Sequence, residues 1–257
     1  MLRVAQRADI QEAVGRLDEL TRRLRRDCPW DREQDERTIV PHTIEEAYEL
    51  ADAANGGDDA KLLDELGDVL FQVHFLSLLL EERGAGDLAA VAEHCRQKLI
   101  RRHPHVFGQV EVESAAQVLR NWDQIKRSEP GREDAIFHDV PENLPALLHA
   151  RKLQRRAASS GLDVEETPFD AVRDQAGALE AAASDRDAAF SALGDLLFAA
   201  VGVARKLHLD PELALRSSAG RFRAAVERAE ELAAGPWEEL GPDEKLSLYA
   251  QARYEAP

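Results

Sequence analysis

Cysteine is scarce in this sequence of 257 residues, which contains only Cys28 and Cys95. The two lie far apart and neither belongs to a Cys-x-x-Cys pair, so neither a disulfide framework nor a cysteine-rich zinc site is indicated. We expect two free thiols in a reducing compartment, which indicates a cytoplasmic protein.

Aromatic residues and long hydrophobic runs are also lacking. Aromatic residues make up 5% of the chain, apolar residues 44% and charged residues 32%, a composition typical of helices rather than of β-sheets. The apolar run from Leu76 to Leu80 is broken by Ser77 and is far too short to cross a bilayer. The sequence therefore predicts an all-α fold without a membrane partner.

Basic charge is in deficit, since 33 Lys and Arg face 49 Asp and Glu and leave a net charge of −16. Phosphate backbones attract basic surfaces and repel acidic ones, so a general nucleic-acid-binding role is disfavoured. The abundant carboxylates suit divalent cations instead.

Apolar residues at helical spacing predict a series of helices. A polar loop up to Pro41 is expected after the first helix, and Thr43 with Glu46 has the pattern of a capping box. The second and third helices are joined by a short turn, so we expect them to pair antiparallel. The predicted helices are 14–26, 44–54, 61–82, 88–102, 115–127, 144–159, 169–180, 187–207 and 211–232. The helix at 211–232 is expected to complete the set, and a linker is expected at 128–134.

Carboxylates gather on two neighbouring predicted helices, as Glu45-Glu46-x-x-Glu49 and Glu65-x-x-Asp68. Residues three or four apart share a helix face, so antiparallel pairing would bring the two acidic faces together. Such acids repel one another, and a hard divalent cation such as Mg²⁺ or Mn²⁺ relieves the repulsion. The same spacing also occurs on solvated helix faces, with the first acids acting only on the helix N-terminus.

A series of separate motifs runs in order along the chain. They are Cys-Pro-Trp-Asp at 28–31, Glu-Glu-Ala-Tyr-Glu at 45–49, Glu-Leu-Gly-Asp at 65–68, the run from Lys98 to Gly108, Trp122-x-x-x-Lys126 and further stretches within 144–158. Together these motifs resemble the MazG family, and the similarity covers residues 15 to 160 and continues more faintly to about 230.

The resemblance implies an all-α, Mg²⁺-dependent nucleoside triphosphate pyrophosphohydrolase that cuts NTPs and dNTPs between the α and β phosphates, a role in nucleotide-pool house-cleaning. It assigns metal binding to Glu46, Glu49, Glu65 and Asp68. Glu45 completes the acidic cluster, and Glu45 and Glu49 are the candidates for activating the attacking water. A homodimer is expected, because a metal site on two helices needs further helices to cover it.

Cations and a tryptophan are candidates for substrate binding. Lys98 and Arg102 lie one turn apart on one predicted helix, and Trp122 and Lys126 repeat that spacing on the next. An isolated pair of this kind is usually a surface cation or a core-edge aromatic, and the family resemblance is what assigns these four to the substrate. Trp30 is a candidate for stacking on the base or, alternatively, a packing plug in its turn.

A sequence echo predicts two related helical units, the second degenerate. Leu-Gly-Asp-x-Leu-Phe occurs at 66–71 and again at 193–198. Aligned on Asp195, the second copy has Ala192 in place of Glu65, and only Asp174 represents the first acidic motif. We expect a catalytic domain over 1–130, a linker and connecting helix over 131–160, and a silent second unit over 161–257.

Two other classes of protein compete with this interpretation. One is a non-catalytic helical interaction module in which the acids are merely solvated. The other is a di-iron carboxylate oxidoreductase, which joins its acids to Glu-x-x-His pairs. None of the eight histidines follows a glutamate by three residues, so the sequence itself disfavours the second class.

Overall fold

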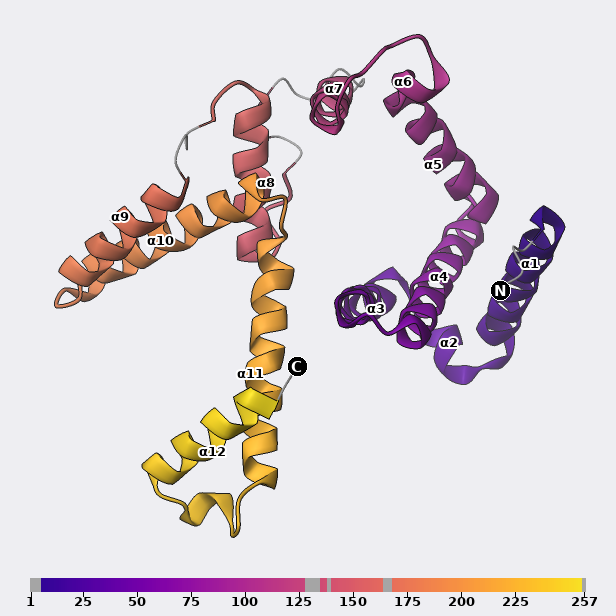
Figure 1. The fold of residues 1–257 in the computed structure, drawn as a ribbon. Helices are drawn as coiled ribbons and strands as arrows, with labels where there is room; N and C mark the ends of the chain where they lie inside the picture. Colours follow the sequence, from indigo (N-terminus) through magenta and orange to yellow (C-terminus); the bar gives the residue numbers. More distant parts are fainter. Residues whose placement is uncertain (1–5, 128–134, 138–139, 164–167, 256–257) are drawn as a thin grey trace. The chain divides into compact units, whose positions relative to one another are not determined.

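The computed structural model describes residues 6–127, 135–137, 140–163 and 168–255, and within these ranges the regular structure is entirely helical (Figure 1). The all-α prediction is therefore confirmed. The chain divides into two compact units, Met1–Trp122 and Asp123–Pro257. The first contains α1 (Arg7–Asp27), α2 (Pro29–Glu33), α3 (Glu36–Gly56), α4 (Asp59–Glu82), α5 (Leu88–Arg102) and α6 (Pro104–Phe107), and α7 (Ala115–Arg127) crosses the boundary.

The helices α3 and α4 form an antiparallel pair, as the sequence predicts. Gly57 ends α3 in the left-handed conformation, with φ of 70°, which glycine adopts without a steric penalty. The carboxylate of Asp58 then accepts hydrogen bonds from the amides of Ala60 and Lys61, at 3.0 and 3.1 Å, and so begins α4. The C-cap at Gly57 and the N-cap at Asp58 thus form the turn between the two antiparallel helices.

A small hydrophobic core holds this pair together. It consists of Ile39 from α3 with Phe75 and Leu79 from α4, and Phe71 and Leu76 pack against it. Across the pair the hydroxyl of Thr43 lies 3.3 Å from the side-chain oxygen of Gln72. These contacts fix the register of the two helices and therefore the positions of the acids that they carry.

Helix α3 begins eight residues earlier than predicted, so the expected loop up to Pro41 is wrong. Asp35 accepts from the amides of Arg37 and Thr38, and its own amide donates to the Thr38 hydroxyl at 2.9 Å. This capping box, together with burial of Ile39, outweighs the cost of about 3 kcal/mol for a proline inside a helix. Thr43 lies within the helix and is not its cap.

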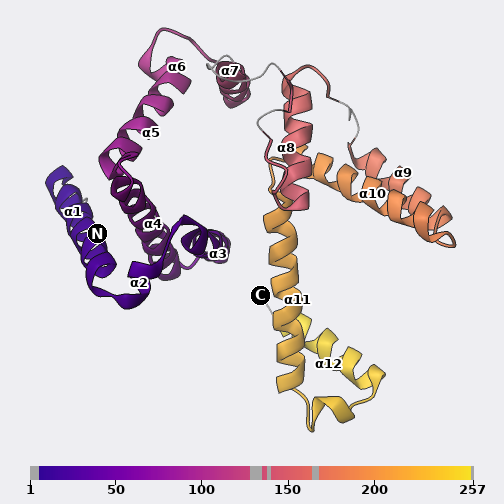
Figure 2. The ribbon, with the colours of Figure 1, turned by 180° about the vertical axis from the view of Figure 1, so that it is seen from behind.

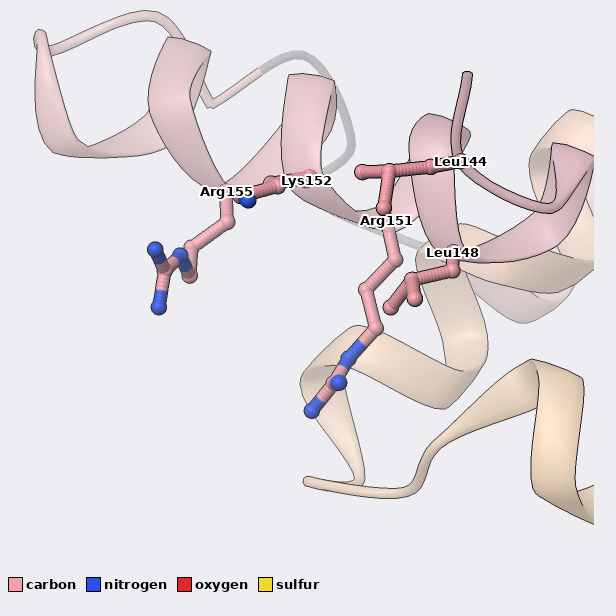
Figure 3. Close-up of a pocket in the computed structure, with 5 residues that line it drawn as sticks. All are labelled: Leu144, Leu148, Arg151, Lys152 and Arg155. Atoms are coloured by element: carbon pink, nitrogen blue, oxygen red, sulfur yellow. The ribbon is translucent and has the colours of Figure 1, made fainter. Parts of the chain in front are cut away.

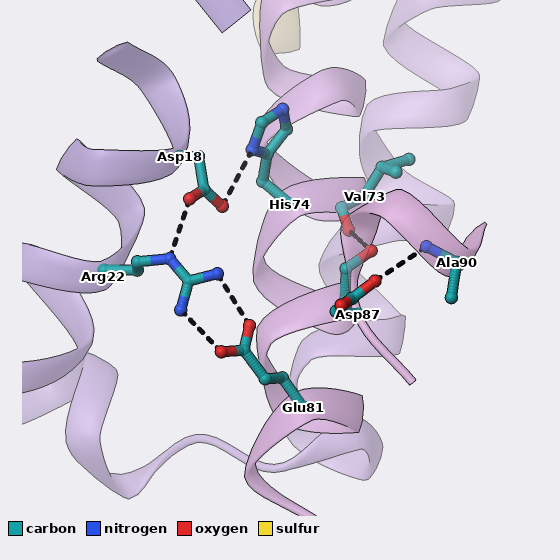
Figure 4. A network of polar contacts seen from close by, with 8 residues as sticks. Asp18, Arg22, Val73, His74, Glu81, Asp87 and Ala90 are labelled. Atoms are coloured by element: carbon teal, nitrogen blue, oxygen red, sulfur yellow. Dashed lines mark hydrogen bonds and ion pairs between the residues drawn. The ribbon is translucent and has the colours of Figure 1, made fainter. Parts of the chain in front are cut away.

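An ionic network joins α1 to α4 (Figure 4). Arg22 donates from its two terminal nitrogens to both carboxylate oxygens of Glu81, at 3.0 and 2.6 Å, and from Nε to Asp18 at 2.7 Å. The other oxygen of Asp18 lies 3.9 Å from Nδ1 of the buried His74. A parallel bidentate pair joins Arg25 to Glu82. These pairs hold α1 against the face of α4 that carries His74.

The second unit has a thinner core. Its helices are α8 (Ala146–Ser159), α9 (Pro168–Ala181), α10 (Arg186–Lys206), α11 (Pro211–Glu231) and α12 (Pro242–Glu255). Helix α10 packs along α9 and also contacts α8, as both views of the ribbon show (Figures 1 and 2). The buried apolar residues here are small, namely Val140, Ala157, Ala199, Val201, Ala225, Ala229 and Ala252.

Helix α8 carries four Arg and Lys residues and no acid. Arg151, Lys152 and Arg155, together with Leu144 and Leu148, line a small cavity of about 180 Å³ (Figure 3). Arg151 donates at 2.7 Å to Asp210, which also caps α11. The pair therefore fastens α8 to the start of α11.

The remaining predicted helices are largely confirmed. Asp87 caps α5, accepting from the amide of Ala90 at 2.7 Å, and Ser114 accepts from the amide of Gln117 at the start of α7. The prediction that the set ends near residue 232 is wrong, because α12 follows and its Tyr249 contacts Phe222 of α11. The predicted linker at 128–134 lies outside the described residues.

One helix among those described, α10, is long and apolar enough to cross a bilayer by length and composition. One such helix is weak evidence for a membrane span. The same helix also packs against α8 and α9 within its unit.

Candidate active site

Three acidic side chains converge between α3 and α4. Glu46 and Glu49 come from α3 and Glu65 from α4, and each offers a carboxylate oxygen that lies within 4.8 Å of the other two. The spacing of three residues puts the first two on one face of α3, and the antiparallel register adds the third. The arrangement can hold a metal ion, since hard divalent cations take several carboxylate oxygens.

Glu65 is the most constrained of the three acids. Only 6% of its surface is exposed, and its Oε2 has no hydrogen-bond partner. Burial of a carboxylate without a partner is costly, and an ion bound among these oxygens would remove that cost. Glu65 is therefore not an acid on a solvated helix face, as the alternative interpretation of the spacing would have it.

The environment also makes ionisation of two of these acids unfavourable. Burial, and then the charges of Asp68 and Glu49, raise the pKa of Glu46. Burial, and then the charge of Glu49, likewise raise the pKa of Glu65, although Lys61 opposes the shift. Crowded carboxylates with raised pKa values are typical of a site that a divalent cation neutralises.

The other two predicted acids lie at the margin of this group. Asp68 is exposed one turn after Glu65, outside the three-oxygen group, yet its charge contributes to the raised pKa of both Glu46 and Glu65. Glu45 is exposed, and its carboxylate lies 3.7 Å from Nδ1 of His42. The structure thus brings three of the five acids into direct proximity.

His42 is a residue that sequence reasoning missed. It lies on α3 three residues before Glu45, and its ring meets the ring of Trp30 edge to face, with centroids 5.9 Å apart. Trp30 is about half exposed and lies on α2. The helical spacing of 42, 45, 46 and 49 would have revealed His42, had α3 been predicted to begin at Glu36 rather than at Ile44.

A second missed residue is Lys61, which lies one turn before Glu65 on α4. It lines an open hollow of about 510 Å³ together with Gly67 and Asp68. A Cβ atom at Gly67 would meet nothing within 4 Å, so close packing does not explain this glycine. The hollow leaves the surface beside Asp68 accessible to a ligand.

Two of the predicted substrate-binding residues, Arg102 and Trp122, lie in contact with each other. The guanidinium carbon of Arg102 lies 5.9 Å from the Trp122 ring, and His103 meets that ring edge to face at 4.7 Å. Lys98 is half-buried one turn before Arg102 on α5. Lys126 lies beyond the end of the first unit. Helix α5 begins at the end of α4 opposite Glu65 and leads away from the α3–α4 pair (Figures 1 and 2).

The second unit does not repeat the acidic group. Asp174 on α9 and Asp195 on α10 are both exposed, and Ala192 takes the place expected for a third acid. Across the described part of this unit, no three acidic, histidine or cysteine side chains come close enough to share an ion.

Comparison with known proteins defines the class to which this acidic helical pair belongs. Residues 34–107, which include α3, α4 and α5, match the MazG nucleotide pyrophosphohydrolase domain. All three converging carboxylates lie within the matched region.

Relatives of known class extend the match beyond this domain. The chain is 36% identical to a nucleoside triphosphate pyrophosphohydrolase of Escherichia coli, over 86% of this chain and 88% of that protein. It is 37% identical to the nucleoside triphosphate pyrophosphohydrolase/pyrophosphatase MazG of Thermotoga maritima, over 86% and 87%. The protein belongs to the MazG family of nucleotide pyrophosphohydrolases.

Proposed function

We propose that this protein is a nucleoside triphosphate pyrophosphohydrolase that converts NTPs and dNTPs to nucleoside monophosphates and pyrophosphate. Family membership supports the reaction class. The observation that carries the assignment to particular residues is the convergence of Glu46, Glu49 and Glu65, the last buried with an unpaired oxygen. We propose that it acts in the cytoplasm in nucleotide-pool house-cleaning.

The fit of the acidic group to a divalent cation supports Mg²⁺ as the cofactor, with Mn²⁺ as a substitute. Glu46, Glu49 and Glu65 would hold the ion, and Asp68 would complete the ligand set from the edge of the open hollow. When bound, the ion would neutralise phosphate charge and polarise the α-phosphoryl group.

The chain's own carboxylates then act on the attacking water. The water oxygen forms a bond to the α-phosphorus, the bond from that phosphorus to the bridging oxygen of the β-phosphate breaks, and a carboxylate takes the proton. Glu49 is the better candidate for this role, because it is exposed and also belongs to the three-oxygen group. Glu45, directed toward His42, is the alternative.

The substrate would be bound by the aromatic and cationic residues around the acids. Trp30, whose ring is half exposed, is proposed to stack on the base. Lys98, Arg102, Trp122 and Lys126 are proposed to bind the triphosphate. Because α5 leads away from the acidic pair in one chain, a second copy is the natural source of these cations.

Exposed apolar residues on α4 also support a homodimer. Leu63, Leu66, Leu70 and Val73 are all exposed, and the first two lie within two residues of Glu65 in the sequence. A stripe of exposed apolar side chains costs free energy when it faces water, and this one lies beside the carboxylates that would bind the metal. A second copy that covered it would also exclude water from the metal site.

The product distinguishes this reaction from other phosphatase chemistry. With a panel of NTPs and dNTPs and added Mg²⁺, we expect pyrophosphate and the nucleoside monophosphate in equal amounts, and no turnover after chelation. Ion chromatography separates pyrophosphate from orthophosphate. Orthophosphate as the direct product would contradict the assigned bond. An inactive protein that Mg²⁺ does not stabilise would favour the helical interaction module instead.

Residues 161–257, within the second unit, are proposed to be catalytically silent. Residues 1–130 are proposed as the catalytic domain, and residues 131–160 as a linker and connecting helix. Asp195→Asn is expected to leave the rate unchanged, while the matched Asp68→Asn lowers it by about 10- to 100-fold, because only Asp68 stands beside other acids. Ala192→Glu alone is expected not to restore activity in an Asp68→Asn chain. Steady-state rates of the three variants test this, and equal losses at the two aspartates would contradict it.

A further inference from the structure

The small cavity beside α8 in the second unit is lined by three cations (Figure 3). Arg151, Lys152 and Arg155 form one part of its wall, and Leu144 and Leu148 form the rest. All three cations belong to a helix that carries no acid. In a chain with a net charge of −16, three positive side chains around one cavity are a local excess of the opposite sign.

Helix geometry brings these cations together. Arg151 and Arg155 are four residues apart and share a face of α8, and Lys152 lies three residues before Arg155 on the adjoining row. Figure 3 shows the two guanidinium groups extended to the same side of the helix. Like charges at this spacing repel one another, and an anion bound among them would remove the repulsion.

The contacts of these cations position them and leave them able to bind an anion. Arg151 donates from one terminal nitrogen to Asp210 at 2.7 Å, and a guanidinium has several further N–H donors. The other oxygen of Asp210 caps α11. Lys152 and Arg155 also take part in other interactions. Ion pairs of long side chains near a surface contribute little stability, so an anion can replace them.

We propose that this cavity binds a small polyvalent phosphate anion of the pyrophosphate class, with its oxygens on Arg151, Lys152 and Arg155. Guanidinium groups bind phosphate through charge-assisted, often bidentate hydrogen bonds. The leucine wall excludes water and thereby strengthens the attraction between the charges. The volume of about 180 Å³ lies below the range of about 300–1,000 Å³ for drug-sized ligands, so a nucleoside would remain outside.

The site lies within the second unit and does not depend on the reaction assigned to the first. Calorimetric titration of pyrophosphate into the full chain, with EDTA present, therefore tests it separately. Without a divalent ion, the carboxylates of the first unit repel phosphate. We expect pyrophosphate to bind at least about tenfold more tightly than orthophosphate or sulfate, because it carries more charge and reaches more of the three cations. ATP is expected to bind no more tightly than pyrophosphate.

Variants of α8 locate the binding. Lys152→Gln and Arg155→Gln are each expected to weaken it about tenfold, since each removes one charge-assisted hydrogen bond. Arg151 is left unchanged because it fastens α8 to α11. Arg173→Gln is the matched control, since it removes a cation from α9 that pairs with Asp170 outside the cavity. Lys98→Gln tests the predicted substrate cations of the first unit. Both controls are expected to bind as the wild type does, and circular dichroism checks the folding of all four.

Four results would overturn the proposal. The first is no binding of pyrophosphate at millimolar concentration, and the second is wild-type affinity in either Lys152→Gln or Arg155→Gln. An equal loss in Arg173→Gln or Lys98→Gln would show that the anion responds to total charge or lies in the first unit. Sulfate binding as tightly as pyrophosphate would show an adventitious anion only.

Discussion

Glu49→Gln is expected to lower the rate of pyrophosphate release by at least about 100-fold while leaving the helices folded. The residue is an exposed member of the three-oxygen group, so its loss removes both an ion ligand and the favoured acceptor of the water proton. Changes to groups that only support a ligand already cost about 10- to 100-fold, and a ligand itself should cost more. Single-turnover and steady-state assays at saturating Mg²⁺ measure the effect.

Glu45→Gln is the matched control for this experiment. The side chain has the same length and lies on the same helix, but its carboxylate lies 3.7 Å from His42 Nδ1 and outside the three-oxygen group. We expect a loss several-fold smaller than for Glu49→Gln. Full activity in Glu49→Gln would remove that residue from the site, and a larger loss in Glu45→Gln would transfer the role in water activation to Glu45.

Magnesium is expected to stabilise the protein against unfolding, and more strongly as the pH rises from about 4.5 toward neutrality. The folded state raises the pKa of both Glu46 and Glu65 above their usual value of 4.5. Without metal these two groups bind more protons in the folded than in the unfolded chain, so their contribution to stability falls as the pH rises through that window. Mg²⁺ replaces the protons, and a concentration 100 times its Kd should add about 2.7 kcal/mol.

Thermal unfolding across a pH series, with Mg²⁺ or EDTA, measures this linkage. Glu65→Gln is expected to reduce the stabilisation by Mg²⁺ and, without metal, to be more stable than the wild type at neutral pH, because it removes a buried charge that lacks a partner. Groups such as Glu82, whose pKa is lowered by Arg25, give the opposite slope, so the comparison is made between variant and wild type. An identical response to Mg²⁺ in the two proteins would exclude Glu65 as a ligand.

Much of the helical arrangement could be read from local signals. Aspartates placed before apolar stretches cap α4, α5, α10 and α11, and each helix begins within two residues of its predicted start. The error at α3 has a specific cause. Pro41 suggested a break, but the capping box at Asp35 and the burial of Ile39 act on the turn before it. The burial is a tertiary contact, which a local pattern does not contain.

The candidate site, like the fold, could be predicted only in part from local sequence signals. Spacing on single helices was enough to select Glu46 with Glu49, and Glu65 with Asp68, since residues three apart share a face in any α-helix. It could not select which of the five acids meet. Glu45 turns toward His42 and Asp68 stays at the exposed edge, because the register of α3 on α4 is fixed by the core around Phe75.

The sequence by itself determined an all-α chain and the acids that lie on common helix faces, because helix periodicity and capping act over a few neighbouring residues. Only the tertiary structure decided that Glu65 is buried beside Glu46 and Glu49, and that α5 leads its cations away from them. Those properties depend on distances between helices, which the packing of distant residues sets.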